Sequence, residues 1–303
     1  MQNWAMGAAE ISEPGQGRKG LQTLGALALA LVLPLATPSY ALSEQVKPHP
    51  ITSDLWTRRE DMPKSLLTAK ETPDAKAFLV APRDWDLSGP NPSPLLQADK
   101  TIYQSTRSLK GQPRWSLAQQ DAEIDTPDAP FKAFACVLGQ DIDPKQAPKL
   151  ATLLGSIVKT IEEVQHGAKQ DFARPRPYLA LGGEICVPRE DWLDKSGSHP
   201  SGHAATGMAW AMALSHVKPG LSNALIRRGT AYGESRIVCG VHYASDVEAG
   251  RRVGAASLAA LSLKASYWRA IHAARRELSA LPKARVPARC AAEQATLAQP
   301  VGF

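Results

Sequence analysis

The sequence predicts an all-α fold, an irregular multi-helix bundle, from three observations. Apolar residues recur at helical spacing in several separate stretches, alternating strand patterns are scarce, and prolines stand where helical stretches begin or end. No internal repeat divides the chain. We therefore expect helices packed around one core rather than a sheet or an array of repeats.

The first expected helices are short and cover residues 95–110, 115–124 and 129–138. The next helix is the clearest, because Asp143 is a good N-cap with Pro144 at the first helical position. Apolar residues then recur at helical spacing, at Leu150, Leu153, Leu154, Ile157, Ile161 and Val164. One face of this helix is thus expected in the core, and its C-terminal end carries Lys169.

Residues 178–199 are rich in glycine, proline and charge, which predicts a long loop. A helix is expected to begin at Pro200 and to stop at residues 219–220. Ser245 and Glu248 have the spacing of a capping box at the start of a later helix. The remaining helices are expected over residues 221–238, 245–262 and 266–281.

The segments outside the helical domain, expected over residues 95–281, differ from it in composition. Arg18 and Lys19 precede an apolar run, and small residues at 39–41 suit cleavage by signal peptidase. The run is about 13 residues long, shorter than the roughly 20 that span a bilayer. We expect a secretory signal peptide over 1–41, a proline-rich N-terminal arm over 42–94, and a C-terminal tail over 282–303 that is an arm or disordered.

Cleavage after Ala41 predicts a periplasmic or secreted protein with no stable membrane association, and an uncleaved anchor is the alternative. Four cysteines follow, and an even number outside the cytoplasm favours disulfides. Four cysteines allow three pairings. Cys186 with Cys239 would join two segments beside the candidate site and leave Cys136 with Cys290. Metal binding is the rival reading, but the sequence contains no C-x-x-C pattern.

The charge balance of the chain fits an anionic small substrate better than a nucleic acid. The 35 Lys and Arg residues are interleaved with 29 Asp and Glu residues, and the formal net charge is +6 at pH 7. No run of five or six like charges occurs, so we expect neither nucleic acid nor a membrane surface as a partner. A summed positive field does raise the local concentration of phosphorylated substrates.

Three cations between residues 169 and 236 suit the binding of a phosphoryl group. Charge-assisted hydrogen bonds from Lys and Arg are the strong contacts to nonbridging phosphate oxygens. Lys169, Arg176 and Arg236 are the candidates, although each by itself is more often a surface residue. Arg174 stands close to Arg176, and charge does not choose between them.

The motif Pro200-Ser201-Gly202-His203 stands at the expected start of a helix. Free amides and the helix dipole favour an anion there, and Gly202 lets a phosphate approach the main chain closely. A helix start with a buried histidine is the simpler alternative. The motif therefore offers a second kind of phosphate-binding donor.

His242 and Asp246 stand four residues apart, which brings the two side chains together if the segment is helical or turns once. A carboxylate that accepts from one ring nitrogen fixes the tautomer and leaves the other nitrogen free to attack phosphorus. A pair that only stabilises a helix N-terminus is the alternative. The other histidines have no comparable partner at helical spacing.

Together the motifs Lys-x6-Arg-Pro, Pro-Ser-Gly-His and Ser-Arg-x5-His-x3-Asp, in this order, resemble those of the phosphatidic acid phosphatase type 2 superfamily. This spacing selects Arg176 over Arg174. Within the superfamily, residues 197–203 and 235–242 look like the bacterial class A non-specific acid phosphatases. One departure is His199, where a tyrosine or another aromatic residue is expected.

The resemblance implies the helical bundle of the phosphatase and haloperoxidase kind and an acid phosphatase of broad specificity for phosphate monoesters. His242 would be the nucleophile that forms a phosphohistidine, Asp246 its orienting partner and His203 the general acid. The phosphoryl oxygens would be bound by Lys169, Arg176, Ser201, Gly202 and Arg236. No metal or other cofactor is implied, a homodimer is suggested, and an acidic pH optimum is expected because His203 must be protonated while His242 is neutral.

Other functions could use the same anion site. A phosphotransferase or a nucleotide or pyrophosphate hydrolase would share the phosphohistidine, and a vanadate-dependent haloperoxidase would share the anion pocket. A phosphate-binding protein without turnover is a further alternative, but binding alone does not require a nucleophile and its orienting carboxylate. The sequence leaves the natural substrate open.

Overall fold

Helices form all the regular structure in the residues that the computed structural model describes, which are 56, 59–82, 85–87, 91–282, 284–299 and 301. No strand occurs among them, so the predicted all-α fold is confirmed. The predicted signal peptide, residues 1–41, and the first part of the predicted arm lie outside these residues.

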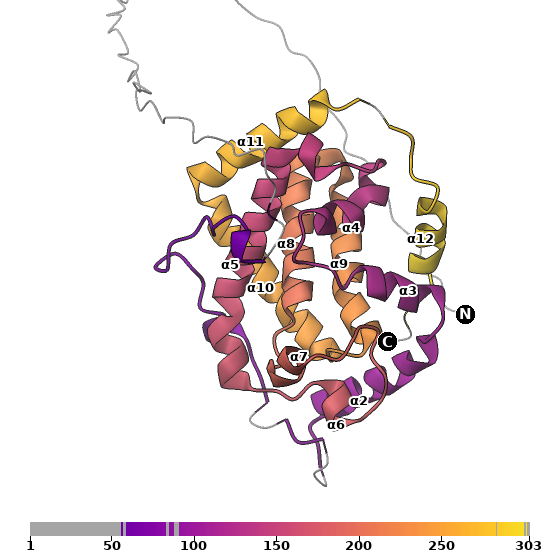
Figure 1. Cartoon of the computed structure of the whole chain (residues 1–303). Helices are drawn as coiled ribbons and strands as arrows, with labels where there is room; N and C mark the ends of the chain where they lie inside the picture. The colour runs from indigo at the N-terminus through magenta and orange to yellow at the C-terminus, as the bar shows by residue number, and fades with distance from the viewer. Residues whose placement is uncertain are drawn as a thin grey trace, which may run out of the picture. The chain divides into compact units, whose positions relative to one another are not determined.

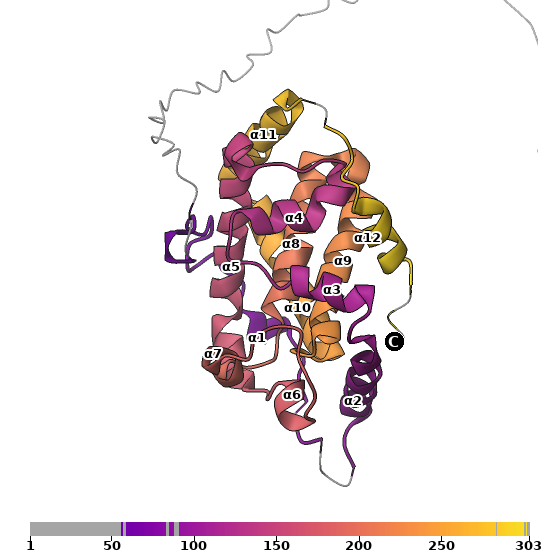
Figure 2. The same cartoon turned by 45° about the vertical axis from the view of Figure 1, so that its right-hand side comes forward.

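The α-helices in chain order are α1 (Ala75–Phe78), α2 (Pro94–Thr106), α3 (Pro113–Gln120), α4 (Asp128–Leu138), α5 (Pro148–Phe172), α6 (Pro177–Ala180), α7 (Asp191–Lys195), α8 (Gly202–Val217), α9 (Ser222–Cys239), α10 (Ala244–Ser262), α11 (Ala265–Ala280) and α12 (Cys290–Leu297). Short 3-10 helices cover Arg59–Asp61, Arg107–Leu109, Pro144–Gln146 and Pro219–Leu221. Helices α5, α8, α9 and α10 lie side by side, with α11 at one end of this group and α2 and α6 at the other (Figures 1 and 2).

Helix α8 is the centre of the core, because it is apolar around most of its circumference and rich in alanine. Small side chains let its neighbours approach closely. A Cβ atom added at Gly254 of α10 would overlap the carbonyl oxygen of Ala205, and one added at Gly229 of α9 would lie 2.6 Å from the Cβ of Ala211. The ends of α8, α9 and α10 are therefore fixed relative to one another by backbone packing.

The long helix α5 begins later than the sequence predicted. Asp143 caps a 3-10 turn, in which its side chain accepts from the amide of Lys145, and the α-helix starts at Pro148. Ala147 precedes that proline with φ −132° and ψ 54°, outside the helical region, because proline disfavours the α conformation in the residue before it. The predicted apolar face is buried as expected.

The start of α10 is also capped differently from the prediction. Asp246, not Glu248, accepts a hydrogen bond from the N-cap amide, that of Tyr243, at 2.9 Å. Ser245, the predicted cap, instead donates its amide to Asp99 at 2.9 Å. The prediction of a Ser245 and Glu248 capping box was wrong because the helix begins at Ala244, so that Tyr243 is the N-cap and Asp246 is the third helical residue.

Two flanking segments pack more closely than their composition suggests. Trp56, Met62 and Leu67, from the described part of the predicted N-terminal arm, are buried in the main core. The C-terminal segment contains helix α12, which the sequence analysis did not predict. The disulfide between Cys136 and Cys290 holds α12 against the domain, and the second disulfide joins Cys186 and Cys239, so the pairing put forward from the sequence is confirmed.

The helices of the described chain are not of the kind that crosses a bilayer, since none is both long and apolar enough. The predicted loop over residues 178–199 is irregular over most of its length but contains the short helices α6 and α7 at its two ends. Its backbone amide at Cys186 donates to the carbonyl of Cys239 at 3.0 Å, which ties the loop to the end of α9.

The close packing of α8 and α10 predicts that Gly254→Ala destabilises the fold by about 1–3 kcal/mol, because the new methyl group would overlap a backbone oxygen. Gly167→Ala is the matched control, since no heavy atom lies within 4 Å of its added Cβ. We expect that change to be neutral or to stabilise the helix by about 0.5–1 kcal/mol. Denaturant unfolding of both variants measures the difference, and equal midpoints would contradict the prediction.

Candidate active site

One cavity brings together most of the residues that the sequence singled out. It has a volume of about 530 Å³. It is lined by six of the predicted residues, Lys169, Arg176, Gly202, His203, Arg236 and His242. These come from the C-terminal part of α5, the segment after it, the first turn of α8, the last turn of α9 and the loop before α10. The two other predicted residues, Ser201 and Asp246, are fully buried and do not line the cavity.

The imidazole of His242 presents its Nε2 atom to the cations of the site. Nη1 of Arg176 lies 3.1 Å from Nε2, and because a guanidinium only donates, Nε2 carries a lone pair there. Nδ1 lies 3.7 Å from Oδ2 of Asp246 and 3.4 Å from Oγ of Ser198. Burial and then Arg176 hold the pKa of His242 well below its ordinary value. The ring is thus neutral, with its proton on the side of the carboxylate.

Asp246 is held by several donors rather than by His242 alone. Its carboxylate accepts from Ser198 Oγ at 2.5 Å, from Arg174 Nη1 at 2.6 Å and from His199 Nδ1 at 3.1 Å. The 3.7 Å separation from His242 is too long for the direct hydrogen bond that the sequence suggested. Burial alone would raise the pKa of Asp246, but Arg174 and the two histidines hold it well below its ordinary value.

Arg174 has a different place from its neighbour in the sequence, Arg176. It is buried in ion pairs with Asp99 of α2 at 2.8 Å and with Asp246 at 2.6 Å. Its guanidinium also lies over the rings of Trp85 and Tyr243, at 4.2 Å and 3.9 Å from their centroids. Arg174 therefore neutralises the carboxylates of Asp99 and Asp246 and does not line the cavity.

The three predicted cations face the cavity, whose lining also includes Glu123, Asp125 and Glu162. Lys169 donates to the carbonyl oxygen of Gly197 at 2.9 Å, and burial followed by the charge of Arg176 lowers its pKa to about 7. Burial lowers the pKa of Arg236 to about 10. Within the described part of the chain, Nε and Nη1 of Arg236 are buried and have no hydrogen-bond partner. Such donors are costly unless an acceptor meets them, and an anion would do so.

His203 is oriented from behind by a backbone carbonyl. Its Nε2 lies 2.9 Å from the oxygen of Ala122. A carbonyl only accepts, so Nε2 carries a proton and Nδ1 is the nitrogen that can exchange one. The ring stacks on Tyr232 with the centroids 6.3 Å apart. Burial and then Arg236 hold the pKa of His203 well below its ordinary value.

Ser201 and Gly202 occupy the predicted helix start but do different things. Ser201 is the N-cap of α8: its hydroxyl accepts from the Ala204 amide at 3.4 Å, and its own amide donates to the carbonyl of Asp246 at 2.9 Å. Its contact with a phosphate stays a prediction. A Cβ atom at Gly202 would lie 2.7 Å from Nε2 of Gln165, so the amide at the end of that flexible side chain would have to shift. Gln165, which lines the cavity, carries no signal in the sequence patterns.

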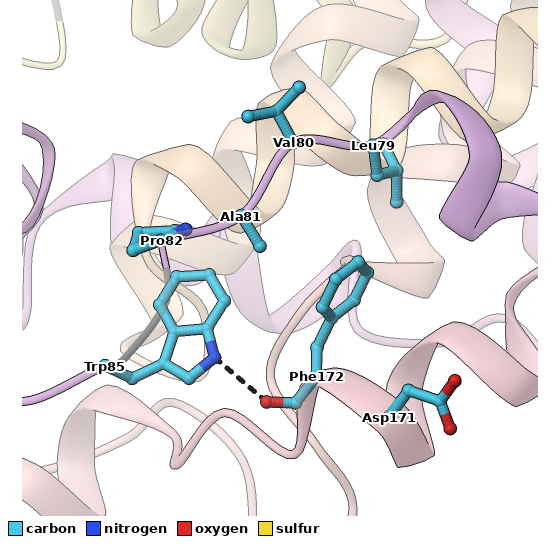
Figure 3. A pocket seen from close by; sticks show the side chains of 7 residues that line it. All are labelled: Leu79, Val80, Ala81, Pro82, Trp85, Asp171 and Phe172. Atoms are coloured by element: carbon cyan, nitrogen blue, oxygen red, sulfur yellow. Dashed lines mark hydrogen bonds between the residues drawn. The ribbon is translucent and has the colours of Figure 1, made fainter.

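His199, the departure noted in the sequence, lies behind Asp246 and does not line the cavity. Its ring packs against Trp85 and Phe172, with centroids 5.2 Å and 5.0 Å away. Trp85 donates its indole N–H to the carbonyl of Phe172 at 2.9 Å, beside a shallow pocket that the segment after α1 lines (Figure 3). The third histidine thus belongs to the support of Asp246.

No three His, Cys, Asp or Glu side chains of the described residues are grouped so that they could hold a metal ion. The groups with unusual protonation that line this cavity are instead cations and imidazoles, whose pKa values are all lowered. A site of this composition is suited to an anion with several oxygens.

Comparison with known proteins gives the same assignment. Residues 150–270 match the PAP2 superfamily. The acid phosphatase of Zymomonas mobilis subsp. mobilis is 38% identical over 197 residues, which cover 65% of this chain and 73% of the relative. The non-specific acid phosphatase of Salmonella typhimurium is 31% identical over 253 residues, which cover 83% of this chain and 92% of the relative. The non-specific acid phosphatase of Salmonella typhi is 36% identical over 191 residues, which cover 62% of this chain and 76% of the relative.

The similarity extends well beyond the segment that carries the three motifs, since the longest of these matches takes in most of both chains. It includes the helices that deliver the cavity residues, α5, α8, α9 and α10, which lie within or across residues 150–270. This chain belongs to the PAP2 superfamily and, within it, to the bacterial non-specific acid phosphatases.

Proposed function

We propose that this protein is an acid phosphatase that hydrolyses phosphate monoesters with broad specificity through a phosphohistidine on His242. The observation that carries the proposal is the cavity shared by His203, His242 and Arg236, whose buried donors have no acceptor among the described residues. Two imidazoles beside buried cations suit transfer of a phosphoryl group, and the names of the relatives agree with this.

Binding of the ester begins with its charged phosphoryl end. The nonbridging oxygens accept from Lys169, Arg176 and Arg236, and the free amides in the first turn of α8, at Gly202, add neutral donors. These groups are fixed by the surrounding fold: Arg176, for example, donates to the carbonyl of Val241 at 2.9 Å. They are therefore already aimed at the charge that develops in the transition state.

In the first chemical step, Nε2 of His242 forms a bond to phosphorus while the bond from phosphorus to the ester oxygen breaks. The leaving oxygen takes the proton from Nδ1 of His203, so an alcohol departs instead of an alkoxide. The phosphorylated ring keeps its proton on Nδ1 and becomes positive. Asp246, held ionised by Arg174, stabilises that charge from 3.7 Å in the free enzyme.

In the second step, water replaces the alcohol. His203, now neutral at Nδ1, accepts a proton from the water as its oxygen bonds to phosphorus, and the bond between phosphorus and His242 breaks. Inorganic phosphate leaves and both rings return to their starting state. If an alcohol took the place of water in this step, the phosphoryl group would be transferred to that alcohol. A phosphotransferase would therefore differ from a phosphatase only in the molecule that accepts the phosphoryl group.

The proposed setting of the enzyme is the periplasm or the extracellular space, after removal of residues 1–41. Two disulfides in the described chain, Cys136–Cys290 and Cys186–Cys239, suit an oxidising compartment. The residues assigned here all come from one chain, so the chemistry does not require the homodimer that the resemblance suggests.

His242→Ala is expected to lower kcat for a chromogenic phosphate ester at least about a thousandfold, because the nucleophile is lost while the cavity around it remains. His272→Ala is the matched control, since this exposed histidine of α11 lies away from the cavity. Circular dichroism checks that both variants fold. Retention of more than a few per cent of wild-type kcat in His242→Ala would refute the nucleophile assignment.

His203→Asn is expected to discriminate between leaving groups. Loss of the general acid should lower kcat/KM by roughly 100- to 10,000-fold for alkyl phosphates, whose alkoxides are strongly basic, and far less for p-nitrophenyl phosphate. The measurement is a series of esters with graded leaving-group basicity, assayed with wild type and variant. Equal losses across the series would show that His203 does not protonate the leaving group.

The pH dependence follows from the lowered pKa values. The pKa of His242 lies well below 6.5, so its neutral form persists into acid, whereas His203, with a pKa also lowered, becomes protonated only as the pH falls. Lys169, with a pKa of about 7, loses its charge as the pH rises past neutrality. We expect kcat/KM to be highest in acid and to fall above neutral pH. A rate that kept rising above neutral pH would contradict this assignment.

A further inference from the structure

Trp192 is a large aromatic side chain left open to solvent at the wall of the cavity. Its residue is 60% exposed, yet it lines the same cavity as His203 and His242. None of the binding and catalytic steps described above uses it. Because the phosphoryl end of the cavity is buried, an exposed lining residue belongs to its opening.

The position of Trp192 is tied to the phosphate-binding group Arg176. Nε of Arg176 donates to the carbonyl oxygens of Leu193 and Ser196, at 2.9 Å and 3.2 Å, and these two residues flank the end of α7. The amide of Ser196 in turn donates to the carbonyl of Trp192 at 3.0 Å. The backbone that carries the indole is thus fixed by the same guanidinium that holds the phosphoryl oxygens.

The indole itself has a defined orientation. Its N–H donates to the carboxylate of Glu190, which satisfies its polar atom. What remains for contact is the flat apolar face of the ring, which attracts other flat ring systems by stacking and by burial of apolar surface.

The leaving group of a bound ester has to pass this part of the cavity. Its oxygen must lie beside His203, which protonates it, and His203 is held by the carbonyl of Ala122. The residues that follow Ala122, Glu123 to Asp125, line the cavity together with Trp192. The organic part of the ester therefore extends from His203 towards the opening, where the indole stands.

We infer that Trp192 determines specificity by stacking on the leaving group, so that the enzyme prefers phosphate monoesters whose alcohol carries a planar ring, such as a nucleobase. This inference rests on the proposed phosphatase function of the same cavity. A ring that stacks equally in the bound ester and in the transition state lowers KM and leaves kcat almost unchanged.

The test compares adenosine 5′-monophosphate with ribose 5-phosphate, because both esters release the same kind of primary alcohol and only one carries a base. Stacking of a base on an aromatic side chain is worth about 1–3 kcal/mol, so Trp192→Ala should lower the ratio of their kcat/KM values about 5- to 150-fold, mainly through KM for the nucleotide. Trp192→Phe should keep a large part of the ratio, since a flat ring remains.

The matched control is Trp268→Ala, which removes a 37% exposed tryptophan of α11 that does not line the cavity and should leave the ratio unchanged. A ratio in Trp192→Ala within about twofold of wild type, or an equal fall in Trp268→Ala, overturns the inference while both esters are still hydrolysed. If the wild-type enzyme hydrolyses neither ester, the proposed function itself is wrong and the inference fails with it.

Discussion

The structure is organised around positive charge that is buried at the cavity. Lys169, Arg176 and Arg236 are desolvated, and the pKa of each is lowered as a result. Desolvating a cation is unfavourable unless partners compensate for the lost water. The surrounding fold holds these groups in place: Arg176, for example, donates to the carbonyl of Val241 at 2.9 Å. An anion with several oxygens would compensate for the lost water, which is the role that the proposed function gives to the phosphoryl group.

A second group of charged residues, Asp99, Arg174 and Asp246, lies outside the lining of the cavity. The carboxylates of Asp99 and Asp246 are both paired with Arg174. Asp246 also joins helices, since it caps α10 through the amide of Tyr243 and its carbonyl accepts from Ser201 at the start of α8. Asp246 thus stabilises the start of α8 and the start of α10, and its charge acts on the His242 ring.

The helical fold and six of the residues that line the cavity could be predicted from the sequence because both depend on local patterns. Apolar spacing located the long helix α5, and the three motifs named every predicted residue that lines the cavity. The start of α5 and the cap of α10 were placed wrongly. Pro148 keeps Ala147 out of the helical conformation, and α10 begins at Ala244 with Tyr243 as its N-cap.

The support behind the site could not be predicted, because it joins residues far apart in the chain. Asp99 contacts Arg174 and Ser245 only when α2 is packed beside α10. The spacing of residues along the sequence does not indicate that contact. Helix α12 was missed for a similar reason: Cys290 and the ion pair of Arg228 with Glu293 at 3.0 Å, rather than its own apolar pattern, hold it in place.

The tight contact of α8 with α10 at Gly250 and Gly254 has a consequence for how such enzymes diverge. Backbone lies against backbone there, so almost any larger residue would displace the ends of both helices and, with them, His203 and His242. The short helix α7 has no such backbone contact with α8, and its Trp192 is 60% exposed, so a side chain there can be replaced without moving the ends of α8 and α10.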